Sequence, residues 1–309
     1  MPRLVLALLL LAPAAVAADP PKRILPDKQL AAGDVLLFDK ESTFGWEAKG
    51  DVAVKDGILL LGKGATITYK CPLPKGAVVA VNGDGSSNQF DHNGGEPLTL
   101  PPKGETAAGG YRKIYFTPDG LKPIFNGKDL TGWSVFKDEK RQNSKAEVTK
   151  DGELRLTDGP GDLQTDGKYA DFVLQLECKT NGDGLNSGVF FRCIAGQYQN
   201  GYEMQIQNGF KDGDRTKPAD GGTGAIYRRM PARKVVGNDK EWVTLTLVAK
   251  GPTFATWVNG YPVAVWTDDR PKDENPRKGL RLDAGHLSLQ GHDKTTDLLF
   301  RNIRLAEIK

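Results

Sequence analysis

From residue 121 to the C-terminus, the sequence is a succession of short segments in which apolar and polar residues alternate, separated by turn residues. "DFVLQLECKT", "GYEMQIQ", "WVTLTLVAK" and "GHLSLQGH" all have the period of two that is typical of half-buried strands. Asn259 and Gly260 lie between two such runs, and this dipeptide favours a type I′ hairpin. Segments with helical period are nearly absent. The pattern predicts an all-β sandwich of jelly-roll type over residues 121–309.

Residues 19–120 are predicted to form a smaller β-rich module that is a diverged partial repeat of the sandwich. Phe38 and Trp46 are eight residues apart, as are Phe125 and Trp133. Each pair is followed by Lys-Asp-Gly and an apolar strand, after which the similarity fades. The alternative is that these strands simply extend the main sandwich.

The N-terminus has the pattern of a secretory signal peptide. Arg3 precedes the apolar run 4–12, and small residues lead to a cleavage site after Ala17 or Ala18. We therefore expect residues 1–18 to be removed and the protein to be periplasmic or secreted. The apolar run is shorter than the ~20 residues that span a bilayer, so no membrane span is predicted.

Charge and cysteine content exclude some classes of function. The chain carries 42 basic and 39 acidic side chains, a balance that argues against a nucleic-acid partner. Cys178 and Cys193 lie on the two arms of a predicted hairpin, offset by several residues and so beyond disulfide reach. Both are in phase with core residues, which predicts buried free thiols, and Cys71 has no obvious partner.

The strand "YEMQIQ" has one apolar and one polar face. If Tyr202, Met204 and Ile206 point into the core, then Glu203, Gln205 and Gln207 point outward. The same phase argument predicts that one outer surface also carries Gln175, Glu177, Phe190, Arg192, Ser288, Gln290 and His292. Amides, a guanidinium and an aromatic ring suit a neutral polyol, so we predict a small saccharide or glycan as the partner. The alternative is an ordinary solvated sheet face.

The polar face lacks the usual pair of acids. Ordinary glycoside hydrolysis requires two carboxyl groups, but the alternate positions on this strand are Glu203, Gln205 and Gln207. One Glu, His292 and Arg192 remain as a possible base, an acid and a group that stabilises negative charge. This set suits proton abstraction beside a carbonyl group. We expect Arg192 to lie beside Glu203 and to hold it ionised at neutral pH.

Several motifs resemble the family of 3-keto-disaccharide hydrolases: "PIFNGKDLTGW", "NSGVFFRC", "NGYEMQIQN", "GTGAIYRR", "WVTLTLVAKG" and "GHLSLQGHDKTTDLLFRNIRL". They occur in order from about Leu121 to Ile308. The resemblance implies a concanavalin A-like lectin/glucanase sandwich in exported bacterial proteins. It also implies cleavage of glycosides whose sugar carries a ketone at carbon 3. That ketone acidifies the proton on carbon 2, so one base can start an elimination that expels the glycosidic oxygen.

The resemblance extends to individual residues, and we predict Glu203 and His292 to be catalytic. The predicted substrate-binding residues are Phe190, Arg192, Gln205, Gln207, Asn208 and Gln290. The family pattern has an Asp soon after the Gln-Ile pair, where this chain has Asn208, so a metal ligand or a catalytic acid is replaced here. No cofactor is predicted, and a divalent cation and the oligomeric state stay open. The alternative function is a non-catalytic carbohydrate-binding module that uses the same face.

Overall fold

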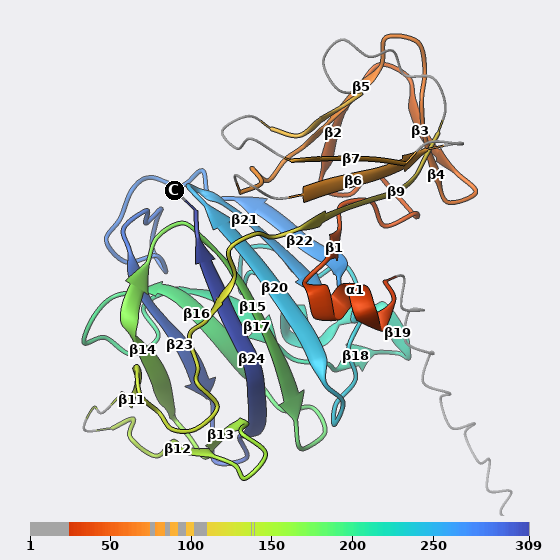
Figure 1. Ribbon diagram of the computed structural model, residues 1–309. Helices are drawn as coiled ribbons and strands as arrows, with labels where there is room; N and C mark the ends of the chain where they lie inside the picture. Colours follow the sequence, from red (N-terminus) through yellow and green to blue (C-terminus); the bar gives the residue numbers. More distant parts are fainter. Residues whose placement is uncertain are drawn as a thin grey trace, which may run out of the picture.

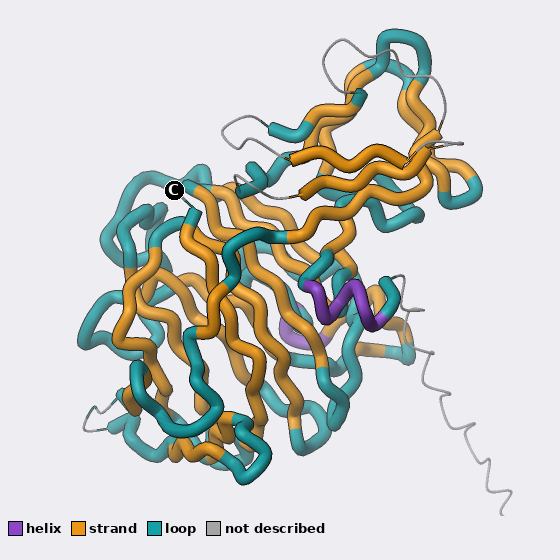
Figure 2. Tube along the Cα trace, viewed as in Figure 1, coloured by secondary structure: helices purple, strands orange, loops and turns teal. Residues whose placement is uncertain are grey.

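The computed structural model confirms an all-β protein. It describes residues 25–74, 78–83, 87–91, 97–101, 110–136, 138 and 140–308. The predicted signal peptide lies outside this part of the chain. Within it, only α1 (Asp27–Ala32) and the short 3-10 turn η1 (Ala219–Gly221) are helical, as Figure 2 shows. No helix among the described residues is long and apolar enough to cross a membrane.

One layer of the C-terminal part is an antiparallel eight-stranded sheet (Figure 1). Its strands, in spatial order, are β12 (Lys145–Val148), β13 (Leu154–Thr157), β24 (Asp297–Glu307), β15 (Phe172–Thr180), β20 (Val243–Lys250), β21 (Thr253–Val258) and β22 (Tyr261–Thr267), and β10 (Lys122–Pro123) pairs with β24. The turn between β21 and β22 contains Asn259 and Gly260, both with positive φ, as a type I′ turn requires. The predicted hairpin is therefore confirmed.

The second layer is a five-stranded antiparallel sheet. Its order is β11 (Trp133–Val135), β14 (Gly161–Tyr169), β23 (Gly285–Gly291), β16 (Ser187–Cys193) and β17 (Tyr202–Ile206). A separate two-stranded hairpin, β18 (Phe210–Lys211) and β19 (Asp214–Pro218), follows β17. The chain crosses between the layers several times, for example from β14 to β15, from β15 to β16 and from β23 to β24. This is the jelly-roll arrangement that the sequence predicts.

The main core lies between the two sheets. Its buried side chains include Leu174 of β15, Phe191 of β16, Met204 of β17 and Leu289 of β23. These residues have the inward phase that the alternation predicts. The phase also identifies the outward residues of these strands, except where a bulge interrupts β16.

The N-terminal module has two small sheets of its own. The strands of one are β1 (Val35–Leu36), β3 (Val52–Lys55), β4 (Ile58–Leu61), β6 (Val78–Gly83), β7 (Ser87–Asp91) and β9 (Gly110–Thr117). The other consists of β2 (Trp46–Lys49), β5 (Thr66–Tyr69) and β8 (Thr99–Leu100). None of these strands pairs with a strand of the sandwich among the described residues.

The repeated Phe and Trp have equivalent local roles in the two parts of the chain. Trp46 Nε1 donates a hydrogen bond to the carbonyl oxygen of Leu37 at 2.6 Å. Trp133 Nε1 donates to the carbonyl oxygen of Ile124 at 2.8 Å. Each indole thus binds the residue just before the Phe of its pair, so the motif fixes the same local chain path twice.

The N-terminal module packs on the outer face of the eight-stranded sheet (Figure 1). Val173, Val248 and Trp257 of the sandwich belong to the same buried cluster as the module's own core. Trp257 Nε1 donates to the carbonyl oxygen of Leu36 at 2.6 Å, and its ring contacts Phe116 edge-on. The part of this outer face that carries Val173, Val248 and Trp257 is consequently covered by the module.

Candidate functional site

A polar cavity of about 430 Å³ lies on the outer face of the five-stranded sheet. Four of the predicted site residues line it: Glu203, Gln205, Gln290 and His292. Glu203 and Gln205 come from β17, and Gln290 from β23, with His292 just beyond its end. The structure therefore places the two predicted catalytic side chains at one cavity.

Glu203 is the best-enclosed carboxylate of this cavity, since the residue is only 5% exposed. Its Oε2 accepts a hydrogen bond from Nη2 of Arg277 at 3.2 Å. Arg277 is itself positioned by two contacts, because its Nε donates to the carbonyl oxygen of Gln199 and its guanidinium lies over the ring of Phe190. Phe190 thus supports the arginine from below and is fully buried.

Burial raises the pKa of Glu203 to about 7, and the charge and hydrogen bond of Arg277 only partly offset this effect. We predicted that a neighbouring guanidinium would hold this carboxyl ionised at neutral pH. That prediction is wrong, because the loss of solvent around this nearly enclosed carboxyl raises its pKa by more than the ion pair with Arg277 lowers it. Near pH 7, Glu203 exchanges between its protonated and ionised forms, as a general base or acid must.

The prediction that Arg192 lies on the polar face beside Glu203 is also wrong. From Phe190 to Cys193, β16 advances by three residues while the paired strand β23 advances by only two, so β16 contains one extra residue. Arg192, within this stretch, has a φ of 52°. This is a β-bulge, which turns the residue out of the expected alternation. Arg192 is 0% exposed and binds the carbonyl oxygens of Ala170 and Arg281 and the carboxylate of Asp171.

The same bulge reverses the expected side of Cys193. Cys193 is opposite His286 and so lies on the outer side of the sheet, whereas we predicted that it faces the core. Cys178 and Cys193 are nevertheless buried free thiols, as predicted, and Cys71 is a buried free thiol as well.

Gln207 and Asn208 lie beyond the end of β17 and do not line the cavity. The amide of Gln207 binds the backbone of Gly184 and Gly209. Asn208 is buried, donates to Asp239 and accepts a hydrogen bond from Thr223. Both amides therefore connect loops of the protein to one another, which is a structural role.

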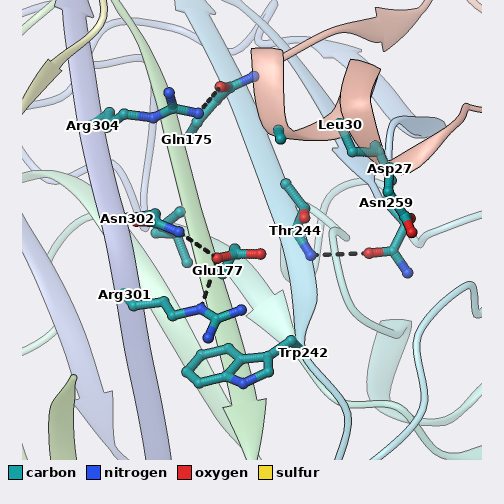
Figure 3. Close-up of a pocket in the computed structure, with 12 residues that line it drawn as sticks. Asp27, Leu30, Gln175, Glu177, Trp242, Thr244, Asn259, Arg301, Asn302 and Arg304 are labelled. Atoms are coloured by element: carbon teal, nitrogen blue, oxygen red, sulfur yellow. Dashed lines mark hydrogen bonds and ion pairs between the residues drawn. The ribbon is translucent and has the colours of Figure 1, made fainter. Parts of the chain in front are cut away.

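Gln175 and Glu177 lie on the other sheet and not on the predicted common surface. Both point outward from β15 toward a second cavity, of about 390 Å³, beside α1 (Figure 3). Glu177 accepts hydrogen bonds from Arg301 and Asn302, and Gln175 donates to the carbonyl oxygen of Gly33. These polar groups are largely satisfied within the protein.

The sequence argument missed several residues around Glu203. They come from segments without strand period: Arg141, Tyr198, Gln199, Tyr227, Arg228 and Arg277. The segment that carries Tyr227 runs along the free edge of β17, where the amide of Tyr227 donates to the carbonyl oxygen of Glu203. Because Arg192 was the predicted partner of Glu203, the sequence offered no signal that the arginine would come from an irregular segment.

Gly188 determines where the Glu203 side chain can lie. A Cβ atom at residue 188 would be 2.6 Å from Oε1 and 2.9 Å from Cγ of Glu203. We expect Gly188→Ala to displace this carboxylate and, for the reaction proposed below, to lower kcat by about 100-fold, as a small misplacement of a proposed reacting group would. Steady-state kinetics would measure it, with Gly182→Ala as the matched control because its Cβ would make only ordinary contacts. Full activity in Gly188→Ala would contradict the assigned position of the carboxylate.

No group of three or more His, Cys, Asp or Glu side chains in the described ranges is placed to hold a metal ion. A second acidic side chain close to the cavity amides, Asp220, accepts hydrogen bonds from Gln205 at 2.9 Å and from Asn186 at 2.7 Å. These amides satisfy the carboxylate and keep η1 against β17.

The fold and the polar cavity define a jelly-roll sandwich of the concanavalin A-like lectin/glucanase class. Residues 120–306 match the 3-keto-alpha-glucoside-1,2-lyase-like domain family, and the chain belongs to this family. The family assignment places the chain among carbohydrate-active proteins.

Solved structures with the same fold include two candidate glycosyl hydrolases from Parabacteroides distasonis. The first is 21% identical, with a TM-score of 0.50, over 62% of this chain and 94% of the other. The second is 25% identical, with a TM-score of 0.46, over 61% of this chain and 100% of the other. A carbohydrate-binding module from Bacillus subtilis is 17% identical, with a TM-score of 0.40, over 56% of this chain and 94% of the other. No curated protein matches the sequence.

Proposed function

We propose that the protein cleaves 3-keto-glycosides or 3-keto-disaccharides by abstracting a proton beside the ketone. The observation that carries the proposal is a single, nearly buried carboxyl, Glu203, whose pKa is about 7, in a cavity whose other lining side chains are amides, arginines, tyrosines and one histidine. One base of this kind suits an elimination, whereas conventional glycoside hydrolysis needs two carboxyl groups. The family to which the chain belongs supports the same chemistry.

The proposed reaction has two balanced steps. Ionised Glu203 removes the proton on carbon 2, and the electron pair left there forms the carbon 1–carbon 2 double bond as the bond from carbon 1 to the glycosidic oxygen breaks. The departing oxygen takes up a proton and leaves as an alcohol. Addition of water across the new double bond then gives the free 3-keto sugar, so that the overall change is hydrolysis.

Each cavity residue has a role in this proposal. His292, which lines the cavity and binds Asp293 at 2.9 Å, protonates the leaving oxygen. Arg277 orients Glu203 through their ion pair. Gln205 and Gln290 bind sugar hydroxyl groups, since amides both donate and accept hydrogen bonds. We further propose that residues 1–18 are a cleaved export signal and that the module within 19–120 is a separate structural unit.

A non-catalytic saccharide-binding module is the second candidate, because the same amides would hold a sugar without reacting. The experiment that separates the two is turnover of 3-keto-glucosides by the purified protein, with the unoxidised glucosides as controls. Release of the alcohol from the oxidised substrates alone supports the enzyme. Binding of both without release of alcohol supports the module.

The pH dependence provides a further prediction. The base must be ionised, so kcat/KM should fall tenfold per pH unit as the pH drops below about 7, where Glu203 takes up a proton. An ordinary exposed Glu would lose activity only near pH ~4.3. A pH–rate profile of His292→Gln identifies the group, because the limb near pH 7 should persist in this variant. Loss of that limb in His292→Gln, or a limb near pH 4 in the native protein, would count against Glu203.

A further inference from the structure

Unpartnered polar atoms are concentrated on the outer face of the five-stranded sheet. Nine buried side-chain nitrogen or oxygen atoms in the described residues have no hydrogen-bond partner, and six of them belong to this face. They are both carboxyl oxygens of Asp162, Nε2 of Gln164, Oγ of Ser288, and Oε1 of Gln205 and of Gln290. Buried polar groups in native proteins are normally paired, so such a cluster requires a ligand or ordered water.

The strand register makes these side chains neighbours. Asp162 of β14 is directly opposite Gln290 of β23, and Gln164 is directly opposite Ser288. Gln290 also lines the open cavity beside Glu203, whereas Asp162, Gln164 and Ser288 do not. The row of outward polar side chains therefore extends beyond the open cavity, from β17 across β23 to buried positions on β14.

The β16–β17 connection, residues 194–200, covers this continuation. The connection is closed at its base by a hydrogen bond from the Ile194 amide to the carbonyl oxygen of Asn200 at 2.9 Å. Its tip reaches toward the opposite edge of the five-stranded sheet, where β11 ends. There the Tyr198 ring contacts Phe136 and lies 4.3 Å from the guanidinium carbon of Arg141. We call residues 194–200 the roof loop.

The roof loop satisfies Asp162 only weakly, through approaches of Gln199 that fall short of ordinary hydrogen-bond geometry. Ser288 and Gln199 lie near enough to Asp162 to lower its pKa, but burial dominates and raises the pKa to about 7. Asp162 is 0% exposed and makes no hydrogen bond of ordinary geometry. The amides of Gln164 and Gln290, the hydroxyl of Ser288 and the carboxyl of Asp162 are donors and acceptors that match sugar hydroxyl groups, which also donate and accept.

We propose that the roof loop covers a second sugar subsite, formed by Asp162, Gln164, Ser288 and Gln290, which holds the leaving sugar unit of a disaccharide substrate. This inference rests on the proposed function, which supplies the first sugar unit at Glu203. The subsite is contiguous with the open cavity through Gln290, and it opens when the contacts of Tyr198 are released.

The test compares two substrates in matched variants. Ser288→Ala and Gln164→Leu each remove one unpartnered group, and Ser134→Ala, at an exposed residue of β11, is the control. For a 3-keto-disaccharide, we expect KM to rise about 5- to 10-fold in the two subsite variants, as for the loss of one hydrogen bond to a substrate. For a methyl 3-keto-glucoside, which has no second sugar, KM should change less than about twofold.

Three results would overturn the proposal. Equal losses with both substrates would indicate a general defect, and unchanged constants with both would indicate that the buried atoms bind only water. If the native protein turns over neither substrate, the proposed function fails, and calorimetric titration with the unoxidised disaccharide then decides the subsite. Weaker binding in Ser288→Ala than in Ser134→Ala supports the subsite even then, and equal binding in the two variants overturns it.

Discussion

Glu203→Gln is expected to lower kcat on a 3-keto-glucoside by about 1,000-fold, within the range that general base catalysis contributes. The amide has nearly the same shape as the carboxyl and can still accept a hydrogen bond from Arg277, so the cavity should keep its form. It cannot take up the carbon 2 proton, however, because an amide is not a base at neutral pH. Binding of the substrate should therefore change much less than its turnover.

Glu177→Gln is the matched control for this experiment. Glu177 is held by Arg301 and Asn302 on the outer face of the opposite sheet, away from the cavity of Glu203 (Figure 3). Its substitution should leave kcat unchanged. If Glu203→Gln retained more than a tenth of the native rate, the base would lie elsewhere, and a modest loss of affinity without any native turnover would favour the binding module.

Alternation along single strands predicted part of the site, because the side of a strand that a residue faces depends mainly on local period and core hydrophobicity. Glu203, Gln205 and Gln290 reach one cavity for this reason. Gln175 and Glu177 have the same outward phase but belong to the other sheet. The period of two shows which side chains of a strand face the core and which face outward. The sheet that the strand joins depends on pairing with strands far away in the sequence, and a short segment carries no information about that pairing.

Arg192 shows a second limit of the same reasoning. Its strand lacks a glycine at the bulge, and an arginine with positive φ is uncommon, so nothing local indicates the extra residue. The bulge exchanges two arginines: Arg192 becomes a buried brace on Asp171, and Arg277 from an irregular segment becomes the partner of Glu203. An arginine still pairs with Glu203, but a different residue provides it.

The sequence also did not predict which surface of the sandwich the N-terminal module packs against. Phe38 and Trp46 predict a local motif, and the structure contains it, but the partner of the module is the outer face of β15, β20 and β21. Val173, Val248 and Trp257 are apolar residues at outward positions of these strands. An apolar residue at an outward position is the signal that the sequence offers for a covered face.

Trp257→Ala is expected to lower the free energy of unfolding by about 3–5 kcal/mol, the range for removal of a large buried aromatic side chain. Trp257 is fully buried between the module and the sheet, and its indole also binds the carbonyl oxygen of Leu36, which would lose its partner. Trp242→Ala is the matched control, because this half-buried ring on the same sheet contacts Arg301 and Lys179 at the surface and should cost far less. Urea unfolding followed by circular dichroism would measure both.

Since the shared core joins the module to the sandwich, the native protein should unfold in one transition, and Trp257→Ala should separate it into two. A loss below about 1 kcal/mol, with a single unchanged transition, would show that the module and the sandwich are stable independently of this contact.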